Sequence, residues 1–164
     1  MKLSGDSKFS ITNLTAYWAG KLNTTERWNF YIPSFKMEEL LSPDGLSLYK
    51  RTNQVPLDFG SALMLEGFRA KIGHPLKVNH AGLKLRGYRS HEENASIEGS
   101  ANFSFHCLGR AFDISCDQVK CVDLFQAAIA YGWHGVGLYD TWVHVDNRLS
   151  LDGNSVTWDK RKKK

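Results

Sequence analysis

Two short segments contain residue types that together could bind a metal ion. The first, S-F-H-C-L-G-R-A-F-D, carries His106 and Asp113, and the second, W-V-H-V-D, carries His144 and Asp146. Alternate side chains of a strand share one face, so the two valines would face a core while the imidazole and the carboxylate lie opposite. Two imidazoles and one carboxylate are a common ligand set for catalytic zinc, with the fourth position left to water. Because such an ion brings the pKa of the water toward neutrality, the chemistry indicated is hydrolysis.

The same residues also fit a structure without a metal. A histidine or an aspartate on a strand is commonly solvated or hydrogen-bonded to a neighbour. In the first segment, Gly109 would let the chain turn, so that His106 comes from a loop while Asp113 projects from a strand. The spacing alone leaves both interpretations open.

The elements that must position these residues are short. Helical spacing of apolar residues predicts helices over 35–41, 59–72 and 121–131. Alternating patterns predict strands over 76–80, 83–87, 111–115, 136–139, 142–146 and 156–158. The sequence S-P-D-G at 42–45 is typical of a turn, and the polar stretch 90–105 is typical of a long surface loop. Strands that meet in hairpins predict an α+β fold, a small antiparallel sheet with flanking helices.

Length and composition favour one globular domain. The chain has 164 residues, of which 42% are hydrophobic. Its net charge of +4 comes from a basic tail at 160–164, and without these five residues the net charge would be −1. Because a groove that follows phosphates is expected in a basic body, we expect no nucleic-acid partner for the domain. The tail itself could direct the protein to an anionic polymer such as a cell wall, bind nucleic acid, or remain solvated without a partner.

We expect three parts in the chain: an irregular lead-in at 1–34, a domain at 35–150 and a C-terminal segment with the basic tail at 151–164. Four aromatic residues of the lead-in could pack on the domain: Tyr17, Trp18, Trp28 and Tyr31. The N-terminus lacks the apolar run of a signal peptide, and no stretch reaches the roughly 18 consecutive apolar residues that cross a bilayer. The odd set of three cysteines favours buried free thiols and a reduced compartment: Cys107, Cys116 and Cys121. We therefore expect synthesis in the cytoplasm and no membrane insertion. The sequence carries no sign of the oligomeric state, for which we expect a monomer.

Several motifs follow one another in a fixed order along the chain. They are F-K-x-x-E-L from Phe35, G-Y-R-S from Gly87, Asn94, S-x-H-x-x-G-x-A-x-D from Ser104, G-L-Y from Gly137 and V-H-V-D from Val143. This series resembles the motifs of M15-type zinc peptidases, which include D-Ala-D-Ala carboxypeptidases and L-Ala-D-Glu endopeptidases with a hedgehog-like fold. The resemblance extends from about Phe35 to about Arg148, some two-thirds of the chain.

The resemblance implies that His106, Asp113 and His144 hold a zinc ion and that Arg89 faces the site. A guanidinium there could stabilise the oxyanion that develops in amide hydrolysis, or hold a substrate carboxylate through two parallel hydrogen bonds. Without the motif, a surface salt bridge would be the simplest role for Arg89.

Other residues of the motifs are candidates for substrate binding. They are Tyr88 and Ser104, together with His134, for which a hydrogen-bonded loop histidine is the simpler interpretation.

One position departs from the family pattern. Many members carry an acidic general base three residues before the last zinc histidine, and here that position is Thr141, which cannot act as a base. We expect Asp140 to be the catalytic base, because a tight turn could direct its carboxylate toward the site. Asp146 is better placed to orient a ligand or to bind substrate.

The resulting hypothesis is a zinc-dependent peptidase that hydrolyses peptidoglycan stem peptides, as a carboxypeptidase or an endopeptidase. By analogy with the family, it could be a phage-type lysin that is released from the cytoplasm to the bacterial cell wall. The alternative is a non-catalytic, zinc-stabilised module that binds the cell wall or a protein, and Thr141 favours this alternative.

Overall fold

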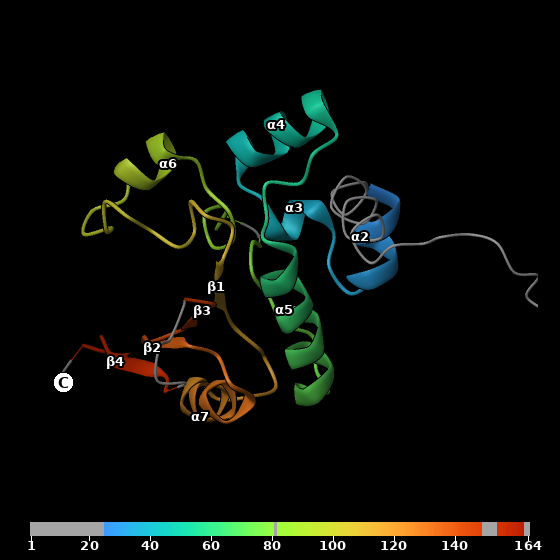
Figure 1. The fold of residues 1–164 in the computed structure, drawn as a ribbon. Helices are drawn as coiled ribbons and strands as arrows, with labels where there is room; N and C mark the ends of the chain where they lie inside the picture. The colour runs from blue at the N-terminus through green and yellow to red at the C-terminus, as the bar shows by residue number, and fades with distance from the viewer. Residues whose placement is uncertain (1–24, 81, 149–153, 163–164) are drawn as a thin grey trace, which may run out of the picture.

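The computed structural model describes residues 25–80, 82–148 and 154–162, which form six helices and a four-stranded sheet, with α7 (Cys121–Tyr131) packed against the sheet (Figure 1). The strands are β1 (Ala111–Ile114), β2 (Gly135–Leu138), β3 (Val143–Asp146) and β4 (Val156–Asp159). The helices are α2 (Thr25–Tyr31), α3 (Met37–Leu40), α4 (Pro43–Thr52), α5 (Phe59–Ile72), α6 (His91–Ala95) and α7 (Cys121–Tyr131). The predicted α+β fold is confirmed.

The sheet has the strand order β1-β3-β2-β4. β3 pairs antiparallel with β1 and with β2, in agreement with the predicted antiparallel sheet, but β4 pairs parallel with β2. β4 runs parallel to β2 because both strands start at the same end of the sheet. β3 ends there, with Asp146 beside Gly135, the first residue of β2. β4 starts at this end on the other side of β2, with Val156 opposite Gly135.

The two faces of the sheet differ in their side chains. Phe112, Val136 and Val145 are fully buried and belong to the hydrophobic core, into which α7 contributes Leu124 and Ala128. Because side chains alternate along a strand, the residues between them lie on the opposite face, which α7 leaves uncovered. Asp113 and His144 lie on this open face, in directly opposed positions.

Helix α5 agrees with the prediction at both ends. The side chain of Asp58 accepts a hydrogen bond from the backbone of Ser61 at 2.9 Å and caps its start. Gly73 ends it with a φ of 73°, a left-handed conformation in which glycine has no side-chain clash. Phe68 of α5 contacts Tyr131 of α7, with ring centroids 5.2 Å apart, so the two helices pack against each other beside the sheet (Figure 1).

The expectation of an irregular lead-in is wrong for its last part. Residues 25–31 form helix α2, and Trp28 is fully buried, with its ring edge-on to Phe59 at 5.6 Å. Burial of one large aromatic side chain stabilises a fold by about 1.5–3 kcal/mol, so α2 belongs to the core of the domain. The packing predicted for Tyr17 and Trp18 lies outside the described residues.

Three local predictions need correction. S-P-D-G at 42–45 begins helix α4, because Ser42 accepts a hydrogen bond from Gly45 at 3.2 Å and proline suits the first helical position. The stretch 90–105 contains helix α6, which Ser90 and Glu93 start with a reciprocal capping box. The predicted strands at 76–80 and 83–87 are reduced to isolated bridges, because their backbone groups bond to loops and turns.

None of the described helices is both long enough and apolar enough to cross a membrane. The three cysteines are free and partly buried, in agreement with the prediction of free thiols.

Candidate metal centre

His106 is held in the turn that leads into β1. Gly109 closes this turn with a φ of 67°, and its Cα lies so close to the backbone of Leu57 that a side chain would collide with it. The imidazole of His106 is only 2% exposed, and its Nδ1 lies 2.8 Å from the carbonyl oxygen of Gly87. When Nδ1–H donates to this carbonyl, Nε2 keeps the free lone pair that a metal requires.

Asp113 and His144 bring two further donor atoms to the same point. Asp113 Oδ1 lies 2.9 Å from His144 Nδ1 and 3.4 Å from His106 Nε2, and the two nitrogens are 3.3 Å apart. Among the described residues, these three side chains form a group that could hold a metal ion.

The donor set fits zinc. A tetrahedral zinc site has bonds of about 2.0–2.1 Å, which places neighbouring ligand atoms about 3.3 Å apart. The three distances between the donor atoms, 2.9–3.4 Å, are close to that value. Two imidazole nitrogens and one carboxylate oxygen are also the ligand types found in catalytic zinc sites.

Asp146 fixes the orientation of His144. Its Oδ2 lies 3.1 Å from His144 Nε2, so Nε2–H can donate to the carboxylate while Nδ1 points to the cluster. Asp146 is fully buried, and Arg148 donates to both of its oxygens at 2.7 and 2.6 Å. Gly135 makes this burial possible, because a Cβ at this position would collide with the carboxylate.

Arg86 holds the second oxygen of Asp113. Its Nη1 lies 3.8 Å from Asp113 Oδ2, and its guanidinium stacks 3.8 Å from the ring centroid of Trp142. The backbone N–H of Asp113 donates to the carbonyl of Arg86 at 2.7 Å. These contacts leave Oδ1 directed at the two histidines.

The pKa values of the three cluster residues are shifted in different directions. Burial raises the pKa of Asp113, but the nearby His106 and His144 outweigh it and hold this pKa well below its usual range. Burial lowers the pKa of His144, but hydrogen bonds with Asp113 and Asp146 outweigh it and raise the pKa to about 9. Burial holds the pKa of His106 below its ordinary value. Near neutral pH the metal-free site therefore contains an ionised Asp113, a charged His144 and a neutral His106.

This arrangement predicts that the metal-free protein loses stability in alkali. His144 titrates near its ordinary pKa of about 6.5 when unfolded and at about 9 when folded, so its protonated form stabilises the folded state. The stabilisation is complete below pH 6.5 and is lost as the pH rises through 9. We expect the free energy of unfolding to fall by up to about 3 kcal/mol over this range. Urea denaturation at a series of pH values, in the presence of a chelator, measures this change in the free energy of unfolding.

His144→Gln should flatten this dependence, whereas His91→Gln, at an exposed position of α6, should leave it intact. An unfolding free energy that is constant from pH 6 to 9 in the wild-type protein would contradict the predicted charge state.

The cluster opens into a cavity of about 650 Å³. Besides the three cluster residues, its lining includes Arg89, Glu98, Ser104, Tyr139, Trp142, Asp146, Arg148 and Trp158. Asp113, His144, Gly137 and Trp158 follow one another across the four strands on the open face. Gly137 has no side chain to separate its neighbours, so the indole of Trp158 lies over it and reaches His144, with ring centroids 5.3 Å apart.

Comparison with known proteins agrees with this geometry. A family model described as Peptidase M15 matches residues 39–146, which include His106, Asp113 and His144. The chain belongs to the peptidase M15 family. Membership indicates a hydrolase of peptide bonds, and it supports the resemblance inferred from the motifs. Curated proteins yield no match to the chain. The M15 match ends at Asp146, so Arg148 and Trp158 line the cavity from outside the matched region.

The structure brings two of the predicted substrate-binding residues of this M15 peptidase to the cavity. Arg89 is 9% exposed, and it donates to the Leu85 carbonyl at 3.2 Å and to Ser104 Oγ at 3.4 Å. Among the described residues it has no ion-pair partner, and its Nε has no hydrogen-bond acceptor. Burial lowers the pKa of Arg89, but not enough to remove its charge near neutral pH. A buried guanidinium with free donors favours an anionic group of the substrate over a surface salt bridge.

Three other residues that the sequence predicts for the site lie away from the cavity of the cluster. Tyr88 packs against Gly45 of α4, and His134 is bonded through Nδ1 to the carbonyl of Arg148 at 2.6 Å. Asp140 is exposed, and its Oδ1 accepts a hydrogen bond from the backbone of Lys162 at 3.2 Å. Neither Tyr88 nor His134 nor Asp140 lines the cavity of the cluster.

The motifs do not include three residues that line the cavity, Glu98, Arg148 and Trp158. Glu98 lies in the stretch 90–105, for which the sequence predicts only a long surface loop. Arg148 and Trp158 follow the last motif, and the alternation of 156–158 predicted a strand without a role. A tryptophan on an edge strand, opposite a glycine of the neighbouring strand, is the signal that could have identified Trp158.

Proposed function

We propose that this protein is a zinc-dependent peptidase that hydrolyses bonds in the stem peptides of peptidoglycan. His106, Asp113 and His144 would hold the zinc ion, which when bound supplies Lewis-acid activation of water and of the scissile carbonyl. The observation that carries the proposal is the convergence of three donor atoms within 3.4 Å of one another. Each histidine also has its second nitrogen on a fixed acceptor, which selects the tautomer for metal binding.

Arg89 would bind the charge of the substrate. It lines the cavity of the cluster beside Ser104, with donors that no described residue uses. A fixed cation stabilises an oxyanion that develops on the scissile carbonyl, and it can equally hold a carboxylate of the peptide.

Replacing Arg89 by methionine should lower kcat/KM by about 100-fold, because a charged donor to the reacting peptide is removed. Zinc content should not change, since Arg89 makes no contact with the three donor atoms. Arg51→Met, at an exposed position of α4, is the matched control and should keep full activity. If Arg89→Met retains the wild-type kcat/KM, the guanidinium does not act on the substrate.

The proton acceptor must be a carboxylate of this chain that reaches the cavity. Asp140, the residue predicted from sequence, is directed to the C-terminal segment. Asp146 lines the cavity, but its oxygens are engaged by His144 and Arg148, which suits an orienting role. Glu98 lines the cavity, is exposed, and has no hydrogen bond or ion pair with another described residue. We therefore assign the proton transfer to Glu98.

The test of the proposed function is hydrolysis of purified peptidoglycan by the full chain. We expect about one zinc per molecule by elemental analysis, release of amino groups from the substrate, and loss of this release after chelation. Restoring zinc should restore the activity. Bound zinc with no release of amino groups would refute the peptidase.

That last outcome would instead support a non-catalytic, zinc-stabilised module that binds the cell wall or a protein. The observation in its favour is Thr141 at the position of the usual acidic base. Release from the cytoplasm to the cell wall, as in a phage-type lysin, fits the proposed substrate. The exposed Lys160–Lys162 segment could direct the protein to an anionic wall polymer.

A further inference from the structure

Arg148 supplies most of the hydrogen bonds to the buried carboxylate of Asp146. Its Nε donates to Oδ1 at 2.7 Å, its Nη2 donates to Oδ2 at 2.6 Å, and its backbone N–H donates to Oδ1 at 3.2 Å. Within the described part of the chain, the other side chain bonded to this carboxylate is His144, through Nε2 at 3.1 Å. Asp146 is fully buried, and a buried carboxylate requires both a paired charge and bonded oxygens. The position of both oxygens therefore depends on Arg148.

Two aromatic rings hold the guanidinium of Arg148 in place. Its Cζ lies over the ring of Phe105, 5.1 Å from the centroid, and over the ring of Trp158, at 5.3 Å. The electron-rich face of each ring attracts the cation. The backbone carbonyl of Arg148 is fixed as well, because Nδ1 of His134 lies 2.6 Å from it. Contacts from the turn before β1, from the residue before β2 and from β4 thus keep Arg148 in one position.

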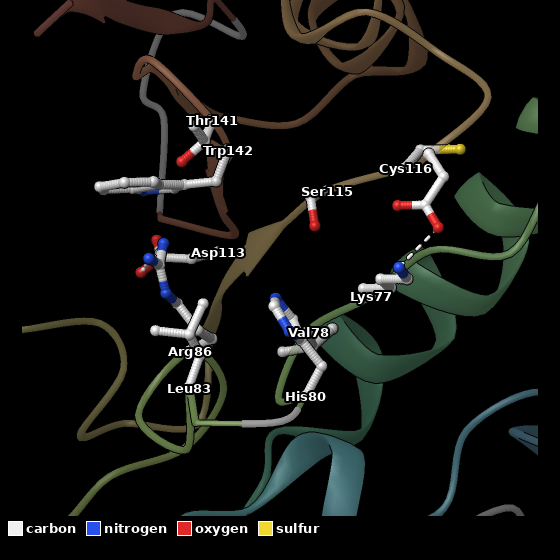
Figure 2. A pocket seen from close by; sticks show the side chains of 11 residues that line it. Lys77, Val78, His80, Leu83, Arg86, Asp113, Ser115, Cys116, Thr141 and Trp142 are labelled. Atoms are coloured by element: carbon white, nitrogen blue, oxygen red, sulfur yellow. Dashed lines mark hydrogen bonds and ion pairs between the residues drawn. The ribbon is translucent and has the colours of Figure 1, made fainter.

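A similar arrangement holds the carboxylate of Asp113. The guanidinium of Arg86 lies 3.8 Å from Asp113 Oδ2 and 3.8 Å from the ring centroid of Trp142, and Figure 2 shows the indole lying over it. In both cases an arginine that contacts an indole holds an acidic side chain. Asp113 is itself a proposed metal ligand, whereas Asp146 is bonded to the proposed ligand His144. The role of Arg148 must therefore pass through Asp146.

The surface of the protein carries the same pair of residues at the same spacing. Arg161 donates from its backbone N–H and from Nε to Asp159 Oδ1, both at 3.0 Å, and from Nη2 to Oδ2 at 2.7 Å. These two side chains are 46% and 48% exposed, and neither residue lines the cavity of the cluster. The hydrogen bonds between arginine and aspartate alone therefore assign no role. Burial, the bond to His144 and the aromatic contacts distinguish the pair of Asp146 and Arg148.

We propose that Arg148 is a positioning residue of the metal site, which acts through Asp146 to hold His144 with Nδ1 directed at the cluster. This inference rests on the proposed zinc site. While Arg148 fixes the carboxylate, the bond to Nε2 prevents the imidazole from turning, and Nδ1 stays 2.9 Å from Asp113 Oδ1 and 3.3 Å from His106 Nε2. Without the guanidinium, the carboxylate and the imidazole can rotate together, so that a metal ion binds more weakly.

A double-mutant cycle on zinc binding tests this role in the full chain, by competition with a chromogenic chelator. Arg148→Met should raise the zinc Kd by about 10–100-fold. Asp146→Asn should raise it by a similar factor, because an amide has one oxygen for two partners. Since Arg148 acts through Asp146, the double variant Asp146→Asn/Arg148→Met should bind zinc within about threefold of Asp146→Asn alone. Arg161→Met removes the same hydrogen bonds from the surface and should keep the wild-type Kd.

Arg148→Lys is the conservative variant, which keeps the charge but cannot donate two parallel hydrogen bonds. Its zinc Kd should lie between that of the wild-type protein and that of Arg148→Met. If Arg148→Met does not fold, Arg148→Lys takes its place in the cycle. An unchanged zinc Kd in the folded variants at this position would overturn the proposal. The same holds if the losses of the two single variants add in the double variant, because Arg148 would then act independently of Asp146.

The cycle measures zinc binding alone, which separates this proposal from the peptidase. Weaker zinc binding in Arg148→Met, without a further loss in the double variant, supports the positioning role even when the wild-type protein does not cleave peptidoglycan. Hydrolysis by a wild-type protein whose zinc Kd does not depend on Arg148 leaves the peptidase intact and removes the positioning role. A wild-type protein that binds no zinc would overturn both the metal site and the role of Arg148.

Discussion

Asp113→Asn is expected to abolish both zinc binding and peptide hydrolysis. Asp113 Oδ1 lies within 3.4 Å of the two histidine nitrogens and is the anionic member of the cluster. The neighbouring histidines hold the pKa of Asp113 well below its usual range, so the residue is ionised at every pH at which the protein would be assayed. An asparagine keeps the shape but removes the charge, and an amide is a weak ligand for zinc.

We expect the zinc affinity of Asp113→Asn to fall by at least about 100-fold and activity to fall below detection. Elemental analysis after gel filtration and the release of amino groups from peptidoglycan measure the two effects. Asp117→Asn is the matched control, because Asp117 is an exposed carboxylate that pairs only with Lys77 among the described residues. Full zinc content in Asp113→Asn would exclude Asp113 as a ligand. Loss of activity in Asp117→Asn would point to a general effect of removing acidic groups.

Glu98→Gln is expected to lower kcat by about 10²–10⁴-fold with little effect on KM, because the proton acceptor is lost while substrate binding remains. Glu98 lines the cavity of the cluster and has no hydrogen bond or ion pair with another described residue, whereas Asp140 is exposed and accepts a hydrogen bond from Lys162. Asp140→Asn should therefore keep activity within about twofold of the wild-type protein. Zinc content should be unchanged in both variants, which separates proton transfer from metal binding.

The reverse result is equally informative. If Asp140→Asn loses activity and Glu98→Gln does not, the turn between β2 and β3 must rearrange when the substrate binds, and the base inferred from sequence is the correct one. A pH profile of kcat supplies a second readout, because loss of the base should remove the acidic limb of the profile in the affected variant.

The elements nearest the cluster could be predicted from sequence because their signals are local. Helix α5 has apolar residues at helical spacing, a capping Asp58 and a terminal Gly73, so its bounds follow from the chain itself. The V-H-V-D alternation likewise fixes which side chains of β3 face the core. The sequence at 42–45 predicts a turn where helix α4 begins, because Ser42 and Pro43 are equally suited to a turn and to the first residues of a helix.

The position of Asp140 could not be predicted in this way. The backbone N–H of Tyr139 donates to the carbonyl of Trp142 at 3.0 Å, so Asp140 and Thr141 occupy the centre of a tight turn. The direction of each side chain there depends on the pairing of β2 with β3 and on the C-terminal segment that passes beside them. Both are contacts between residues distant in sequence.

By itself the sequence determined the types and the order of the residues that we propose as metal ligands, because strand alternation and the motif series place an imidazole or a carboxylate at each position. Only the tertiary structure decided which atoms meet. The pairing of β1 with β3 sets Asp113 opposite His144, and the carbonyl of Gly87 selects the tautomer of His106. Gly137 admits Trp158 from β4 to the same face. The register of β1 with β3, the tautomer of His106 and the approach of Trp158 to Gly137 all depend on residues distant in sequence. No local pattern encodes them.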